Sequence, residues 1–324
     1  MTDHLGHYLG KVLALAVSPA YTEDRVCFAA TNQGLYATTD GGRSWQNVFN
    51  PAKDGTVIAS VTAVAIAPNF AQDNTLLAGL YGGILHSTNR GSSWHSVWQR
   101  SPPPLVTDIL FHSSSDGRQT VVAATLGDGV FLSDDEGRHW SAGNFGLLDP
   151  NVLCLASAPL NNQLFAGVES GLFRSHNGGR TWTETAFPSD LAPLLALEVT
   201  AFGAGEMIWA GTERHGLWAS ADNGRTWNHK GAEHVQAPVN ALQSLGNDSP
   251  AVLIASGQAL YVTDDKDTTW LPVAMDSALP ASILTIAVVP EVDQLEGRDI
   301  FVGLRGDGLR QFLLTTVDKH ITLA

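Results

Sequence analysis

The chain has 324 residues, of which 44% are apolar and 15% charged, and this composition is that of a folded protein. Its formal net charge is −14, with 18 Lys and Arg against 32 Asp and Glu, which disfavours binding to nucleic acid or to anionic membranes. Gly (32 residues) and Pro (15 residues) are frequent enough to predict many short strands joined by turns.

The first residues carry neither a basic segment nor a long apolar run. The apolar stretch 12–17 is too short for the core of a secretory signal, and no stretch approaches the roughly 18 apolar residues of a membrane helix. We therefore expect a cytoplasmic protein with no membrane insertion, and a precursor whose signal was removed stays an open alternative. Cys27 and Cys154 lie in separate apolar runs, which predicts two buried thiols, no metal site and no cofactor.

From residue 12 onward the same strands recur seven times. The first strand of each repeat is apolar, and the seven copies are 12–17, 61–66, 106–111, 152–157, 194–199, 239–244 and 283–288. The second strand ends in two small residues, which are 29–30, 78–79, 123–124, 166–167, 210–211, 255–256 and, less regularly, 302–303. The third strand opens at 34–36, 83–85, 129–131, 171–173, 216–218, 259–261 or 308–310. Small residues suit positions near a ring axis, where neighbouring units converge.

In six repeats the third strand runs into an eight-residue segment that begins with Ser or Thr and ends in Trp. We call these segments the box turns, and they are 38–45, 87–94, 133–140, 175–182, 220–227 and 263–270. Their Trp residues are 49, 46, 42, 45 and 43 positions apart, a spacing that matches one four-stranded propeller blade. The sequence therefore predicts an all-β, seven-bladed β-propeller in one domain. The expected blades are approximately 11–50, 60–100, 105–145, 151–188, 194–232, 239–275 and 283–324.

The third and eighth residues of each box turn are predicted to be structural. They are Asp40 and Trp45, Asn89 and Trp94, Asp135 and Trp140, Asn177 and Trp182, Asp222 and Trp227, and Asp265 and Trp270. The side-chain oxygen can accept backbone N–H groups inside the turn, Gly42 and its equivalents supply a positive φ, and each Trp can bury its ring between neighbouring blades. Six near-identical copies around a ring cannot all be one active site.

The pattern Ser-x-Asp-x-Gly-x-x-Trp of these turns resembles the Asp-box (bacterial neuraminidase) repeat. The resemblance covers nearly the whole chain, although Asp267 replaces the Gly in the sixth copy. It implies a propeller but no single activity, because the family includes sialidases, other glycosidases, sortilin-type receptors and photosystem assembly factors. Sialidases hold their substrate with three Arg, and no such Arg set can be matched here.

The seventh repeat has no box turn. Its fourth strand is expected from 317–323 or from the N-terminal segment around Tyr8, and either would close the ring.

The resemblance implies that ligands bind on the face opposite the box turns. The loops of this face carry eight departures from the repeat, which are Tyr81, Asp128, Glu169, Glu213, Arg214, His215, Arg305 and Asp307. Asp108 and Glu198 break inner-strand rows that are otherwise mostly small. A buried carboxylate needs a partner, so water or Arg could hold them, or they could form a catalytic site.

Two functions remain open on the sequence alone. A non-catalytic scaffold or assembly subunit with a protein partner fits the regular ring and the lack of catalytic motifs, and the segment 98–104 could be its docking edge. The alternative is a sialidase-like or other glycan-active enzyme that binds a glycan or small ligand at the channel mouth and uses the Asp108 and Glu198 carboxylates.

Overall fold

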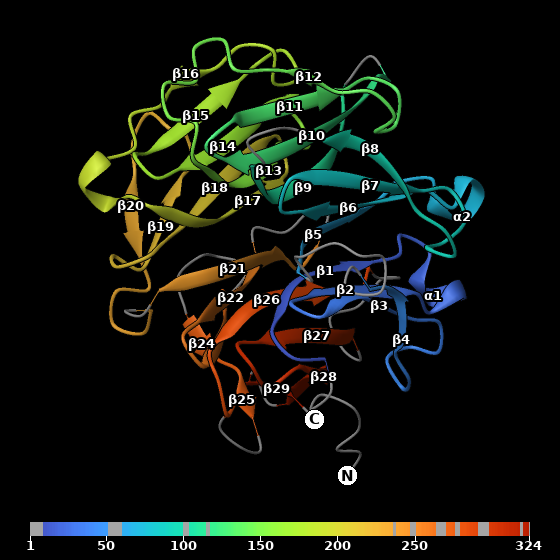
Figure 1. The fold of residues 1–324 in the computed structure, drawn as a ribbon. Helices are drawn as coiled ribbons and strands as arrows, with labels where there is room; N and C mark the ends of the chain where they lie inside the picture. Colours follow the sequence, from blue (N-terminus) through green and yellow to red (C-terminus); the bar gives the residue numbers. More distant parts are fainter. Residues whose placement is uncertain are drawn as a thin grey trace.

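The computed structural model describes residues 9–50, 60–99, 104–114, 117–235, 238–246, 251–263, 270–275, 279–290, 298–317 and 320–323. These residues form seven β-sheets that follow one another around a ring, so that the first sheet lies beside the last (Figure 1). The predicted all-β, seven-bladed β-propeller is therefore confirmed.

Each blade is built from strands that are adjacent in the chain. The first strands are β1 (Val12–Val17), β5 (Val61–Ile66), β9 (Leu105–Ser113), β13 (Val152–Ser157), β17 (Leu194–Phe202), β21 (Val239–Ser244) and β26 (Ile283–Val288). The second strands are β2 (Cys27–Thr31), β6 (Leu76–Leu80), β10 (Gln119–Leu126), β14 (Leu164–Val168), β18 (Gly205–Thr212), β22 (Val252–Ser256) and β27 (Arg298–Leu304).

The outer half of each blade follows the same order. The third strands are β3 (Gly34–Thr38), β7 (Gly83–Ser87), β11 (Gly129–Ser133), β15 (Leu172–Ser175), β19 (Leu217–Ser220), β23 (Ala259–Thr263) and β28 (Leu309–Val317). The fourth strands are β4 (Gln46–Phe49), β8 (His95–Gln99), β12 (Ser141–Ala142), β16 (Thr183–Glu184), β20 (Asn228–Lys230), β24 (Trp270–Pro272) and β29 (His320–Leu323). Short helical turns are α1 (Tyr21–Asp24), α2 (Phe70–Asp73) and η2 (Ser189–Leu191).

The first strands form the inner wall of the ring. Each contacts the first strand of the next blade, and β26 contacts β1. The second strands approach this wall closely: a Cβ at Gly211 would lie 2.6 Å from Cγ1 of Val239, and one at Gly303 would lie 2.7 Å from Cγ1 of Val12. The small residues that end the second strands are therefore required by the packing of each blade on the next.

A β-bulge recurs near the start of every first strand, where the pairing register to the second strand shifts. Where the bulged residue is polar, it bonds to the next blade. The hydroxyl of Thr62 donates to the Val106 carbonyl at 2.6 Å, and that of Thr107 donates to the Val152 carbonyl at 2.7 Å. The bulge also turns the residue after it, which in blade 3 is Asp108, toward the neighbouring blade.

The five described box turns, in blades 1 to 5, share one hydrogen-bond pattern. In blade 1, Oγ1 of Thr38 accepts the Gly42 N–H at 2.9 Å, and Oδ1 of Asp40 accepts the Ser44 N–H at 2.9 Å. Gly42 has a φ of 88°, which a side chain would strain. Equivalent bonds close the other four turns around Asn89, Asp135, Asn177 and Asp222. Asp265 and Asp267 of the sixth turn lie outside the described residues.

The box tryptophans pack toward the preceding blade, but only one of the six is fully buried. Trp182 is 4% exposed and donates its Nε1–H to the Gly143 carbonyl at 2.8 Å. The other five are half-buried, and Trp45, for example, meets Phe301 of the last blade edge-on. Complete burial between blades therefore holds for Trp182, and the large loss expected on truncating a buried ring applies there.

The ring closes through the C-terminal segment. β29 pairs antiparallel with β28 and so supplies the fourth strand of blade 7, while β25 (Ala274–Met275), at the end of blade 6, pairs parallel with the other edge of β29. The alternative closing segment around Tyr8 lies outside the described residues. On the inner side, the Gly308 N–H donates to the Gly10 carbonyl at 2.9 Å, which ties the last blade to the first.

Candidate functional site

Asp108 and Glu198, the two acidic departures from the inner-strand pattern, are each bonded to the backbone of the next blade. Asp108, on β9, accepts the N–H of Ile109 at 2.8 Å and the N–H of Leu155, on β13, at 2.9 Å. Glu198, on β17, accepts the N–H of Ser244, on β21, at 3.2 Å. Because β13 lies between β9 and β17 in the ring, the two carboxylates belong to separate inter-blade contacts.

Burial controls the protonation of both carboxyls. It raises the pKa of Asp108 to about 6 and that of Glu198 to about 7, and the backbone N–H bonds oppose this shift in part. Burial also raises the pKa of the Cys154 thiol, to which the charge of nearby Asp108 adds. Both cysteines are buried and unbridged, so neither thiol has the exposure or the lowered pKa of a reactive cysteine.

The loops between second and third strands lie beside the links that enter the blades. The Glu213 N–H donates to the Pro193 carbonyl at 3.1 Å, and the Gly82 N–H donates to the Pro104 carbonyl at 2.7 Å. The eight predicted ligand-face residues are thus spread over the loops of five blades. Glu213, Arg214 and His215 share one loop, and Arg305 and Asp307 share another.

Several of these eight residues have internal partners. Arg214 pairs with Glu213 at 3.1 Å, and Asp307 pairs with Arg310 at 2.9 Å. The Oε2 of Glu169 accepts the Asn151 amide at 2.9 Å. The remaining four differ in exposure: Asp128 is half-buried, whereas Tyr81, His215 and Arg305 are exposed. A binding role for this face stays a prediction.

The proposed docking edge 98–104 begins with a residue that faces inward. Trp98 is half-buried, and its ring centroid lies 4.6 Å from that of Phe131 in the next blade. Trp98 is therefore part of the contact between blades 2 and 3. Residues 100–103 lie outside the described residues.

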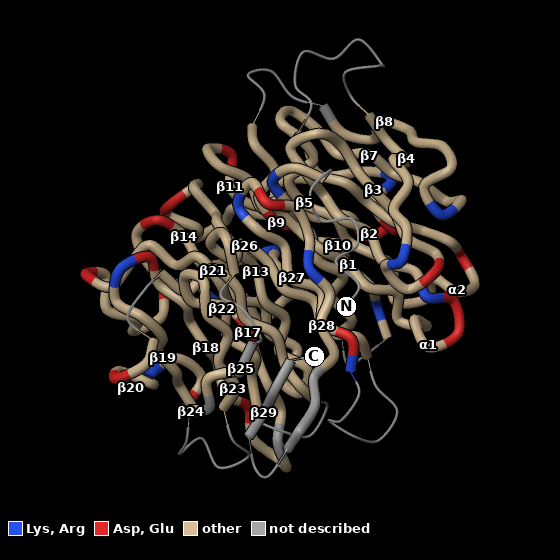
Figure 2. Tube along the Cα trace, turned by 90° about the horizontal axis from the view of Figure 1, so that it is seen from below, with Lys and Arg blue, Asp and Glu red and all other residues tan. Residues whose placement is uncertain are grey.

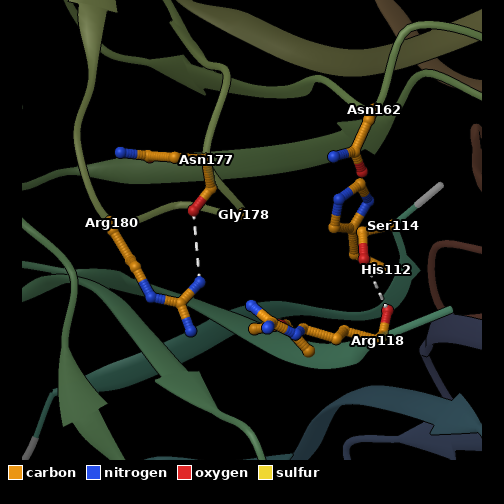
Figure 3. A pocket seen from close by; sticks show the side chains of 8 residues that line it. His112, Ser114, Arg118, Asn162, Asn177, Gly178 and Arg180 are labelled. Carbon is orange, nitrogen blue, oxygen red and sulfur yellow. Dashed lines mark hydrogen bonds between the residues drawn. The ribbon is translucent and has the colours of Figure 1, made fainter. Parts of the chain in front are cut away.

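A pocket of about 330 Å³ opens between blades 3 and 4, on the face that carries the box turns (Figure 3). Blade 3 lines it with residues of its first hairpin, and blade 4 with its first hairpin and its box turn. The lining residues are His112, Ser114, Arg118, Thr120, Asn162, Asn177, Gly178 and Arg180. A second pocket of about 390 Å³ shares Arg118 and Arg180 and adds Gln119 and Asp134. Both pockets lie on the face opposite the eight predicted ligand-face residues.

The two arginines of this pocket come from different blades and extend toward one another across it (Figure 3). Arg180 donates from Nη1 to the Asn177 carbonyl at 3.2 Å, and from Nη2 to both carboxylate oxygens of Asp134 at 2.9 and 2.7 Å. Elsewhere in the described parts of the chain, acidic and basic residues are interspersed along the trace, many of them in loops (Figure 2). Two converging arginines are thus a local exception on a chain of net charge −14.

Two other lining residues, His112 and Asn162, carry buried polar atoms. His112 is 1% exposed, and its Nδ1 is 2.8 Å from the Ser157 hydroxyl. Its Nε2 and the Oδ1 of Asn162 are buried, and neither makes a hydrogen bond of normal geometry to any other described residue. Burial lowers the pKa of His112, which favours the neutral ring, and the adjacent Asn162 amide partly opposes this shift.

Two apolar side chains stand out from the rim beside this pocket. Phe145 and Leu148, on the link from β12 to β13, are each 79% exposed, and we call them the rim patch. The link is held in place, because the Trp182 N–H donates to the Phe145 carbonyl at 2.8 Å and the Gly129 N–H to the Pro150 carbonyl at 2.9 Å. Phe145 also pairs with Thr181, the residue after Arg180, so Phe145 lies beside the box turn that lines the pocket.

The box turns are predicted to be structural, so Arg180 gives no sign of this pocket in the sequence. The hairpins between first and second strands do give one, because blades 1 and 2 place Pro19 and Pro68 where blade 3 has Ser113. Blades 1 and 2 fold there into α1 and α2, whereas blade 3 extends β9 and β10 past the ring and forms a wall of the pocket.

The described residues include no helix long and apolar enough to cross a membrane. Within the same ranges, no group of three or more His, Cys, Asp or Glu side chains is placed to hold a metal ion.

No protein-family model and no curated protein matches the chain. Solved structures do resemble it. A GH74 xyloglucanase from Xanthomonas campestris is 17% identical with a TM-score of 0.68, over 100% of this chain and 55% of that one. An ancestral GH74 enzyme is 17% identical with a TM-score of 0.73, over 99% of this chain and 48% of the enzyme. This chain therefore spans about half the length of these two enzymes.

A third structure matches along its whole length. YCF48 bound to D1 peptide is 16% identical with a TM-score of 0.66, over 97% of this chain and 96% of YCF48. At these identities the resemblance to known structures establishes one property of this chain, its seven-bladed β-propeller fold.

Proposed function

We propose that this chain is a non-catalytic β-propeller that binds a protein partner, as a scaffold or as an accessory subunit of an assembly. The observation that carries the proposal is the rim patch. Phe145 and Leu148 are each 79% exposed on a link whose backbone is tied to both adjoining blades. Exposed apolar side chains held rigidly in this way favour association, because little conformational entropy is lost on binding.

Two further observations support a binding role over a catalytic one. The inner carboxylates, Asp108 and Glu198, are each occupied by backbone N–H groups of the next blade. YCF48, the neighbour that this chain matches from end to end, was solved with a bound peptide. The hydrogen bonds of the five described box turns support membership of the Asp-box repeat family, whose non-catalytic members include assembly factors.

The test compares the partners of the wild-type chain with those of matched surface variants. The tagged protein is isolated from its source cells with the F145S/L148S variant and with Leu313→Ser, an exposed leucine on β28 of blade 7, as the control. We expect a stoichiometric partner with wild type and L313S and its loss with F145S/L148S. Equal recovery with all three proteins, or no partner at all, would contradict the proposal.

A glycan-active enzyme is the second candidate. It is favoured by the raised pKa values of Asp108 and Glu198, of the kind that a general acid requires, and by the resemblance to the GH74 enzymes. A panel of β-glucan, xyloglucan and sialoside substrates, assayed with Asp108→Asn and Glu198→Gln as controls, tests it. Turnover that either substitution abolishes would establish the enzyme, and the absence of turnover above the two variants would eliminate it.

A further inference from the structure

The pocket between blades 3 and 4 has the form of a binding site. Its lining comes from three separate segments, the first hairpins of two blades and one box turn, and every lining residue except Gly178 carries a polar or charged side chain. The His112 ring and the Asn162 amide also belong to this lining, and the Asn162 side chain acts on the His112 ring through a hydrogen bond.

The charge of the pocket selects an anion. Arg118 and Arg180 reach it from opposite sides, and a guanidinium carries five N–H donors in a plane that matches a carboxylate. Arg180 is already engaged by one carboxylate, because its Nη2 bonds both oxygens of Asp134. That pair is exposed on both sides, so it is weak and open to exchange with an incoming carboxylate.

The exposed apolar residue beside the pocket favours a peptide as the ligand. Phe145 of the rim patch pairs with Thr181, directly after Arg180, so an apolar surface continues the basic one along the same inter-blade edge. A peptide that carries an acidic side chain close to an apolar one would satisfy both surfaces.

We propose that the pocket between blades 3 and 4 is the docking site for an acidic segment of a partner protein, with a carboxylate bound between Arg118 and Arg180. This inference rests on the proposed protein-binding function and adds the location and the chemistry of the contact.

The first experiment uses a defined probe. A fluorescent hexapeptide of Glu residues with one Leu is titrated into the full chain at physiological salt, and the same peptide with Gln for Glu is the control ligand. We expect the Glu peptide to bind at least about tenfold more tightly than the Gln peptide, and R118Q/R180Q to remove this preference. Arg225→Gln is the matched control, because Arg225 holds the box-turn position of Arg180 in blade 5, away from the pocket.

A second variant separates recognition from structural damage. Asp134→Asn removes the carboxylate that competes for Arg180, and it should tighten binding of the Glu peptide about threefold or more. A damaged fold would weaken binding instead. No binding of the Glu peptide by the wild type, unchanged binding by R118Q/R180Q, or weakened binding by D134N would each overturn the proposal.

The partner protein distinguishes this inference from the function on which it rests. A partner that is lost with F145S/L148S and kept with R118Q/R180Q leaves the protein-binding function standing and rejects the acidic-segment site. A partner that is lost with both variants and kept with R225Q supports both.

Discussion

A carboxylate inside a propeller ring has to find hydrogen-bond donors, and Asp108 and Glu198 find them on the blade that follows. Each spans the boundary between two first strands, so the same side chain links the blades and carries the desolvation cost of its charge. The two sites differ in one respect. Asp108 uses both oxygens as acceptors, whereas the described bond of Glu198 engages only Oε1.

Glu198 should make the protein less stable at neutral and higher pH than at pH 4.5. Its pKa rises from 4.5 to about 7 on folding, so between these values the folded state holds a proton that the unfolded chain has released. The free energy of unfolding then falls as pH rises through this window, and the full contribution is present only below pH 4.5. Glu198→Gln can keep the Ser244 bond without a charge. It should exceed the wild type by about 2–3 kcal/mol at about pH 8 and equal it near the lower limit.

Urea denaturation of the two proteins at both pH values measures this difference. Glu184→Gln, on exposed β16, is the control and should follow the wild type at either pH. A gain for E198Q that did not change with pH would show that its charge is not the cause.

The third position of the box turn accepts either Asp or Asn. Asp40 accepts the N–H and hydroxyl of Ser44, and Asn89 in blade 2 makes the corresponding contacts with Ser93. The same geometry thus tolerates either side chain at the third position. The box turns and the order of the strands could be predicted from the sequence because their hydrogen bonds join residues within one short segment.

Asp40→Asn should therefore fold with little loss, whereas Asp40→Ala should lose about 1–2 kcal/mol because the Ser44 N–H loses its acceptor. The Ser44 hydroxyl, first among several donors, lowers the pKa of Asp40 from 3.8 to about 2. The hydrogen bonds that lower this pKa contribute their full stabilisation above pH 3.8, and this contribution is lost as the pH falls through 2. Thermal unfolding between these limits should show this acid loss in the wild type but not in D40N. An equal loss of stability at acid pH in the wild type and in D40N would contradict this role of the Asp40 carboxylate.

The packing between blades can be tested by adding a single methyl group. Gly211→Ala would place a Cβ 2.6 Å from Val239, and we expect a cost of about 1–3 kcal/mol from overpacking. Gly171→Ala is the matched control, because a Cβ there meets no atom within 4 Å. Denaturant midpoints of the two variants give the comparison, and a neutral G211A would mean that the blades can move apart without cost.

The candidate site could not be predicted as the elements were, because it depends on contacts between elements. His112 and Arg118 meet Asn162 and Arg180 across a blade boundary, and no spacing in the sequence specifies that meeting. The hydrogen bonds of Asp108 and Glu198 could not be predicted either, because their donors are backbone N–H groups, which every residue except Pro carries. The prediction that a buried acid needs a partner was sound, but the sequence could not name the partner.

At the scale of the molecule, the ring depends on the boundary between blades 7 and 1. Phe301 is 0% exposed there and meets Tyr21 and Trp45 edge-on, with ring centroids 6.0 and 6.1 Å away. Phe165 holds the corresponding position of blade 4 and is 1% exposed. The boundary that joins the two ends of the chain is thus packed like one inside it.

Phe301→Ala and Phe165→Ala should therefore cost the same, about 3–5 kcal/mol each, and both variants should unfold in one transition. Calorimetry measures the number of transitions and their midpoints. A separate early transition in F301A alone would mean that the closing boundary opens by itself.

The box turns also bear on the order in which the protein folds. Their bonds connect residues two to four positions apart, so each hairpin can form locally as soon as its own segment is available. The contact of Gly303 with Val12 joins the two ends of the ring and can form only after the intervening blades are in place. We expect the hairpins to form in microseconds and the ring to close in a later, slower step. Mutations at the boundary between blades 7 and 1 should change the rate of that slower step.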